Sequence, residues 1–222
     1  MLRGEAGLKA RYLLFWPEAP KTGNITKDKI LVAYSFGRNS FSEREVKIMI
    51  YGARENARGT GDAFRILKEI LAFESGNPNS SIASECAEII KEHGIKNVIL
   101  SWEIAFSLWE NDRKLFYQVN PSVIWPDDSK ARMSTREISL KVAEIIREKK
   151  GKEIVLVAHK RLSARAALLL KRALQKEADI AIPEIKTGDF DERSAKWQTQ
   201  GAFKWLTREI LTRIHHLLLG WV

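Results

Sequence analysis

The sequence predicts an α/β fold of the Rossmann-like kind, a three-layer sandwich in which a mostly parallel sheet carries helices on both faces. Two observations predict it. Short, almost uninterrupted apolar runs, typical of parallel strands covered on both faces, alternate with longer segments of helical periodicity. The alternation begins near residue 29 and continues to the end of the 222-residue chain. We therefore expect one α/β domain over residues 29–222 and an N-terminal extension over the weakly patterned residues 1–28.

The strands are expected at the apolar runs, and the clearest of these are residues 29–36, 96–101 and 153–158. Shorter runs predict strands at 122–125 and 180–183. The alternation of Val46, Ile48 and Ile50 suggests a further short strand, and residues 115–119 are interpreted as a strand edge or a loop. Because crossovers between parallel strands are right-handed, the loops after residues 36, 101 and 158 should meet at one edge of the sheet.

Helices are expected where apolar residues recur at helical spacing, at 63–73, 82–93, about 134–150, 163–176 and 194–220, with a short one at 105–109. Ser134 and Glu137 have the spacing of a capping box, and Gly151 is expected to end that helix in a left-handed conformation. Ser80 and Ser81 can cap the helix that Gly94 closes. The last helix combines an apolar stripe with basic residues. It should pack on the sheet, or alternatively lie on a membrane surface.

Composition narrows the classes of partner and compartment. The chain has 37 Lys and Arg against 28 acidic residues, a net charge of +9, which indicates either a basic surface or an anionic partner. The single cysteine, Cys86, excludes an intrachain disulfide and a zinc site built mainly from cysteines. No apolar run approaches the ~20 residues that span a bilayer, and residues 12–16 are too short for a signal peptide. We expect a soluble, cytoplasmic protein.

Polar residues cluster after the strand at 153–158, in the sequence VAHKRLSARA. In α/β folds, the loops that leave the carboxyl ends of strands bind ligands. His159 is a candidate general acid or base, or a hydrogen-bonded loop histidine. Arg165 lies in the first turn of a helix, where a cation opposes the helix dipole. It is therefore a candidate for binding a phosphate or carboxylate, or for a surface salt bridge.

Two further loops complete the candidate site. After the first strand comes a loop with a glycine, and after the second strand comes Ser101. Ser134, Thr135 and Glu137 either cap their helix and do nothing else, or offer helix N–H groups and a carboxylate to a ligand. The predicted catalytic residues are His159 and Glu137. The predicted ligand-binding residues are Gly37, Arg38, Asn39, Ser101, Ser134, Thr135 and Arg165. We predict no metal site, because His93, His215 and His216 do not form a metal-ligand pattern.

The order of these motifs resembles that of the SanA/ElyC/YdcF family of uncharacterised α/β proteins. The matching stretches are VAYSFGRN, VILSWE, STRE, VAHKRLSARA and WLTREILTRI. The chain departs from the family where Gly37 stands without a glycine run, where Trp102-Glu103 follow Ser101, and where Leu162 replaces a usual histidine. The resemblance implies a Rossmann-like fold with a polar crevice and, because one member is thought to bind it, S-adenosylmethionine as a candidate ligand.

Three functions of different classes follow from these observations. The first is the binding of a nucleotide-like or other anionic small molecule. The second is a transferase or hydrolase that acts on an anionic substrate through His159 and Glu137. The third is a nucleic-acid-binding module, suggested by the net charge and seven tryptophans but less favoured because the basic residues are dispersed. The sequence leaves the oligomeric state open.

Overall fold

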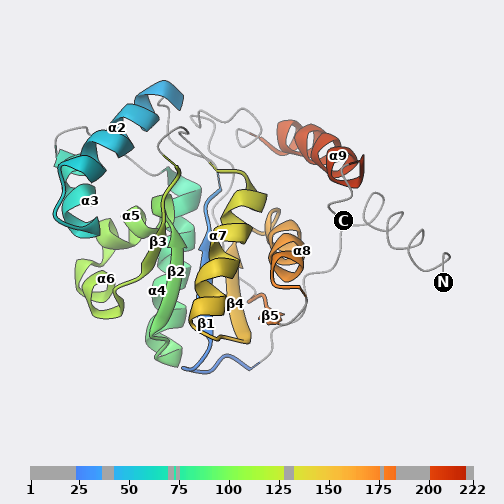
Figure 1. The fold of residues 1–222 in the computed structure, drawn as a ribbon, viewed down its shortest axis with the longest axis horizontal. Helices are drawn as coiled ribbons and strands as arrows, with labels where there is room; N and C mark the ends of the chain where they lie inside the picture. The colour runs from blue at the N-terminus through green and yellow to red at the C-terminus, as the bar shows by residue number, and fades with distance from the viewer. Residues whose placement is uncertain are drawn as a thin grey trace.

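A five-stranded, entirely parallel sheet forms the centre of the protein (Figure 1). The structure is a computed structural model that describes residues 24–36, 43–69, 73, 76–127, 133–175, 178–183 and 201–218. The strands are β1 (Ile30–Tyr34), β2 (Asn97–Ser101), β3 (Ser122–Ile124), β4 (Glu153–Ala158) and β5 (Asp179–Ala181). Their order in the sheet is β3-β2-β1-β4-β5. This arrangement confirms the predicted α/β class and the predicted parallel strands.

Helices connect the strands. They are α2 (Glu43–Glu55), α3 (Thr60–Glu69), α4 (Asn77–His93), α5 (Trp102–Asn111), α6 (Arg113–Val119), α7 (Thr135–Glu148), α8 (Ser163–Ala173) and α9 (Ala202–Leu218). Helices α4 and α5 pack together on one face of the sheet, and α7 and α8 pack together on the other. None of the helices within the described ranges is long and apolar enough to cross a membrane.

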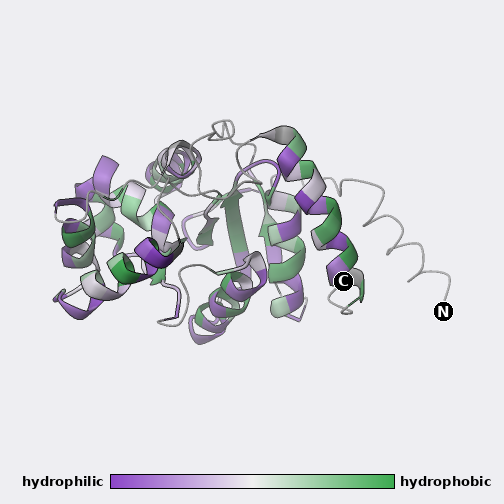
Figure 2. Ribbon diagram, turned by 90° about the horizontal axis from the view of Figure 1, so that it is seen from above, coloured by the Kyte–Doolittle hydropathy of each residue, from purple (hydrophilic) through white to green (hydrophobic). Residues whose placement is uncertain are grey.

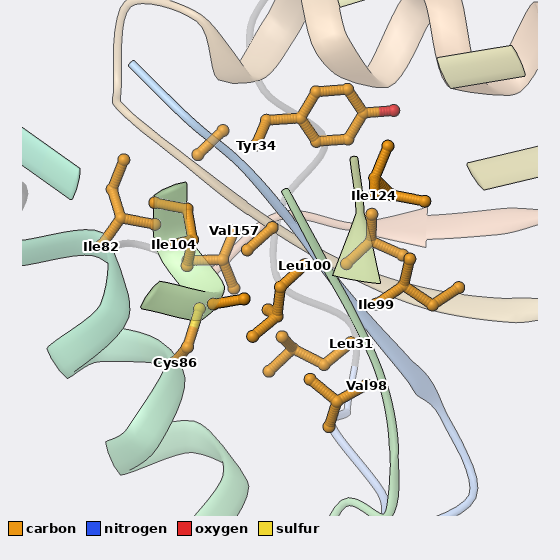
Figure 3. Close-up of a cluster of buried hydrophobic side chains, with 14 of the residues drawn as sticks. Leu31, Tyr34, Ile82, Cys86, Val98, Ile99, Leu100, Ile104, Ile124 and Val157 are labelled. Carbon is orange, nitrogen blue, oxygen red and sulfur yellow. The ribbon is translucent and has the colours of Figure 1, made fainter. Parts of the chain in front are cut away.

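The strands alternate their side chains between the two helical layers (Figure 3). On β1, Leu31 faces α4, which contributes Ile82 and Cys86 to the core, whereas Tyr34 points to the opposite face. There the Tyr34 hydroxyl lies 2.9 Å from Ser139 Oγ of α7. Both faces of β1 are therefore buried, as the continuous apolar run of residues 29–36 predicted. Viewed from above, the sheet is hydrophobic while the helices carry hydrophilic residues (Figure 2).

The strand suggested at residues 46–50 is wrong, because this segment belongs to helix α2. Val46, Ile50 and Ala53 are buried at a spacing of four and three residues, which is one face of a helix. Ile48, which completed the apparent alternation, is 62% exposed. Val46 and Ile50, four residues apart, fit both a strand period of two and a helix period of 3.6. The exposure of Ile48 between them is what distinguishes the helix from the strand.

The prediction for residues 115–119 is also wrong, because they form α6. This helix is only seven residues long, and its start is fixed by Asp112, whose side chain accepts a hydrogen bond from the Leu115 N–H at 2.9 Å. Two turns of helix are too few for a hydrophobic period to be detected in the sequence, so the cap is the only local signal of this helix.

Two of the three expected helix ends differ from the prediction. Helix α4 begins at Asn77 after Gly76, with Pro78 in its first turn, so Ser80 and Ser81 lie inside the helix and do not cap it. Gly94 ends the helix in the left-handed conformation, as predicted. At the end of α7 the left-handed residue is Lys150, with φ of 53°, and not Gly151. Gly151 is required for space, because a Cβ there would overlap the Ile30 side chain.

Candidate functional site

The carboxyl ends of β1, β2 and β4 lie at one edge of the sheet because these strands run parallel and in register. The connection from β1 to β2 ends with α4, which packs on one face of the sheet. The connection from β3 to β4 is α7, which packs on the other face. The strand order therefore reverses between β1 and β4, and in such sheets this is where loops diverge and a crevice opens. We call this place the β1/β4 rim and define it by Phe36 and His159, the residues at which the two strands give way to loops.

Phe36 and His159 contact each other across the rim. Their rings are stacked, with centroids 3.8 Å apart and planes 8° from parallel. Both side chains are buried. His159 Nδ1 accepts a hydrogen bond of 3.3 Å from the Arg161 N–H, so the neutral ring carries its proton on Nε2. The imidazole therefore has a fixed orientation and a fixed tautomer, which are the properties a positioned proton donor needs.

Asn79, in the first turn of α4, fixes the beginning of the loop after β1. Its Oδ1 accepts a hydrogen bond of 2.8 Å from the Phe36 N–H, and its side chain is buried. The sequence prediction missed this residue because it lies in a run of turn-forming residues. A polar side chain in a helix's first turn, 43 residues from its partner, gives no local signal.

Arg165 is held by an acidic residue that the sequence prediction also missed. Arg165 Nη1 donates to Glu209 Oε2 of α9, and Arg213 Nε donates to Glu209 Oε1 at 3.1 Å. The Glu209 side chain is only 2% exposed. Arg165 is thus a partly buried structural link between α8 and α9, and its Nε atom is buried without a hydrogen-bond partner. Glu209 is the only acid in an otherwise apolar and basic helix, and that isolation was the available signal.

The capping box at the start of α7 is present. Ser134 Oγ accepts from the Glu137 N–H at 3.2 Å, and a Glu137 carboxylate oxygen accepts from the Ser134 N–H at 2.7 Å. The carbonyl of Thr135 accepts a hydrogen bond from Ser139 Oγ at 2.8 Å. These contacts give Ser134 and Glu137 a structural role. Neither these contacts nor those described for His159 join the two predicted catalytic residues.

Ser101 ends β2 and immediately precedes α5. It is buried, and its Oγ has no hydrogen-bond partner. Two residues further on, Glu103 is also buried, in the first turn of α5. Polar side chains therefore lie at the carboxyl end of β2 as well as after β4. Gly37, Arg38 and Asn39 lie outside the described residues.

A hollow of about 450 Å³ lies away from the β1/β4 rim, beside the edge strand β3. Trp125, Arg54 and Lys141 line it, and none of the predicted site residues does. Arg54 lies over the Trp125 ring at 5.8 Å, and Lys141 Nζ donates to the Trp125 carbonyl at 3.2 Å. Because these two cations already contact other parts of the chain, the hollow offers a ligand fewer polar groups than its size suggests.

The tryptophans do not form an exposed platform in the described part of the chain. Trp102, Trp109 and Trp205 are buried in the core, and Trp125 is half-buried. Binding of single-stranded nucleic acid relies on exposed aromatic rings in a basic groove. No group of three or more His, Cys, Asp and Glu residues in the described ranges could hold a metal ion.

Comparison with known proteins gives no relative. No protein-family model matches the chain, and no curated protein and no solved structure is significantly similar to it.

Proposed function

We propose that the protein binds an anionic, nucleotide-like small molecule in a crevice at the β1/β4 rim. The observation that carries the proposal is the reversal of strand order between β1 and β4 in an all-parallel sheet, since ligands of open α/β sheets bind at such points. His159 and Phe36 lie at this point, one from each strand.

Positive charge at the β1/β4 rim supports the proposal that the ligand is an anion. Helices α4, α7 and α8 each lead from the carboxyl edge of the sheet to its amino edge, so their N-termini lie at the carboxyl edge. Helix N-termini carry partial positive charge and free N–H groups, which stabilise phosphate and carboxylate. Arg161 belongs to the loop that follows β4 and adds a positive charge next to the start of α8. The ligand should therefore present its acidic group to the start of α8.

A binding panel tests the proposal. The purified full chain is heated alone and with nucleoside mono-, di- and triphosphates, S-adenosylmethionine and inorganic phosphate. S-adenosylmethionine is included because of the resemblance to the SanA/ElyC/YdcF family, of which we propose the chain is a divergent member. A ligand present at 100 times its Kd should stabilise the folded protein by about 2.7 kcal/mol. For a chain of this length that raises the Tm by roughly 5–11 °C.

Variants locate the site. His159→Gln and Thr135→Val should each weaken binding of the stabilising ligand, by at least about tenfold for His159→Gln. His93→Gln is the matched control, because His93 ends α4 at the amino edge of the sheet. Tm values without ligand separate a binding defect from a folding defect. The proposal fails if no panel member stabilises the protein, or if all three variants bind as the wild type does.

A further inference from the structure

The outer face of α9 carries the densest group of exposed hydrophobic side chains in the described part of the protein. Six of the ten exposed large hydrophobic residues belong to this one helix. Five of them recur at intervals of three and four residues and form a stripe along it. We call these residues the outer stripe: Phe203, Leu206, Ile210, Ile214 and Leu218. Hydrophobic and hydrophilic residues alternate along this helix in Figure 2.

The opposite face of α9 is buried against the protein. Trp205, Glu209 and Arg213 recur every four residues and are all buried. Glu209 pairs with Arg165 of α8, and the Arg161 guanidinium lies over the Trp205 ring at 5.5 Å. Figure 1 shows α9 beside α8 at the periphery of the molecule. The outer stripe therefore remains exposed although the helix is docked.

The charges on α9 restrict what can cover the outer stripe. The remaining exposed side chains of the helix are Lys204, Thr207, Arg208, Leu211 and His215. At ~100° per residue, Lys204, Arg208 and His215 lie on one flank of the stripe, and Leu211 lies between them and the stripe. Glu209, the only acid of the helix, faces inwards and is neutralised. The outward surface of α9 is thus apolar and basic, without a negative charge.

We propose that the outer stripe lies on the surface of a bilayer that contains anionic phospholipids. An amphipathic helix with a basic flank binds there by burying its apolar face among the acyl chains while its cations contact the headgroups. The 17 residues of α9 extend about 25 Å, enough for all five apolar residues to reach one plane. A second copy of the chain fits less well, because pairing two such helices brings their basic flanks together, and the one acid of α9, Glu209, faces inwards.

Vesicle co-sedimentation of the full chain tests the proposal. Vesicles of phosphatidylcholine alone are compared with vesicles of phosphatidylcholine and phosphatidylglycerol. We expect binding to the anionic vesicles that weakens as salt is raised. The double variant Ile210→Gln/Ile214→Gln should bind on the order of tenfold more weakly, since two half-exposed apolar side chains are lost. Lys204→Gln/Arg208→Gln should lose roughly fivefold per charge.

Ile48→Gln is the matched control, because Ile48 is an exposed isoleucine on a different helix, α2. It should bind as the wild type does. All of these positions are exposed, so the Tm of each variant should stay close to that of the wild type. The proposal is overturned if the wild type does not prefer anionic vesicles, or if the Ile210/Ile214 variant binds them unchanged.

A fluorescent label reports which face meets the lipid. Cys86 is the only cysteine and is buried, so a cysteine introduced as Ile210→Cys can be labelled selectively with an environment-sensitive dye. We expect the emission to shift to shorter wavelength with anionic vesicles, and no shift for a dye at Ile48→Cys. A dye at position 210 that already reports an apolar environment without vesicles would show that the chain or a second copy covers the stripe, which contradicts the proposal.

Discussion

Replacing Glu209 with glutamine should destabilise the attachment of α9 more than any other single isosteric change in that helix. Its carboxylate accepts hydrogen bonds from Arg165 and Arg213 through different oxygens. Glutamine keeps the shape of the side chain but has one acceptor oxygen and no charge. One arginine would therefore lose its acceptor, and both would lose the negative charge that neutralises them.

The expected loss follows from the burial of the three side chains. Removing one partner of a buried ion pair costs about 3–5 kcal/mol because the other charge remains in a poorly solvated place. We expect the lower end, about 3 kcal/mol, because the Arg165 side chain is still 16% exposed and Arg213 makes further interactions. For a chain of 222 residues this corresponds to a fall in Tm of roughly 6–12 °C.

Urea unfolding followed by far-ultraviolet circular dichroism and by tryptophan fluorescence measures this loss. Glu148→Gln, an exposed acid on α7, is the control and should change the free energy of unfolding by less than about 0.5 kcal/mol. The triple variant Arg165→Met/Glu209→Leu/Arg213→Met should recover most of the stability, because it removes every buried charge of the group. A loss below about 0.5 kcal/mol in Glu209→Gln would refute the reasoning that this carboxylate neutralises buried arginines.

Three further predictions concern the core and one cap. Gly151→Ala should cost about 1–3 kcal/mol, because the new Cβ overlaps Ile30. The added substitution Ile30→Val should restore part of this loss, and Gly52→Ala, where a Cβ meets nothing within 4 Å, should stabilise α2 by about 1 kcal/mol in the same denaturation assay. Burial raises the pKa of the Tyr34 hydroxyl above its usual range, more than its hydrogen bond to Ser139 lowers it. The unfolded chain therefore releases this proton first, near pH ~10, and stability should fall as the pH rises through that value. Tyr34→Phe should make the fall less steep in a pH series of urea unfolding, and an equal slope would count against the burial argument. Asp112→Ala should cost about 1 kcal/mol through the lost cap of α6. Lys91→Ala, which removes only an exposed ion pair with Asp112, should cost less than about 0.5 kcal/mol, and equal losses would show that the ion pair matters more than the cap.

The parallel sheet could be predicted from the sequence because buried strands leave a signal in every residue. Residues 154–158 are apolar throughout, and the structure buries all of them. The start of α7 could also be predicted, since a capping box is a local pattern of four residues. Short helices were harder to predict from the sequence than the buried strands. Helix α6 contains too few turns to show a period, and α2 presents Val46 and Ile50 at positions that a strand would use as well.

The candidate site could be predicted only as a set of loops. The sequence places His159 and Arg165 after a strand, but not the partners that hold them. His159 stacks on Phe36, which is more than 100 positions earlier in the chain, and Arg165 pairs with Glu209, 44 residues later. Such contacts depend on the order of the strands and on where α9 docks, and neither is encoded in a local period. For Arg165 the sequence offered phosphate binding or a surface salt bridge, and the structure shows a salt bridge that is partly buried.

The position of β1 in the middle of the sheet has a consequence for how the protein is made. Ile30 pairs with Asn97 on one side and with Ile154 on the other. During synthesis, this segment must wait until residue 154 has left the ribosome before both neighbours exist. Its hydrophobic residues are exposed throughout that interval, and closing such long loops is slow. Newly made chains should therefore depend on chaperones more than a protein of this size with contacts close in sequence would.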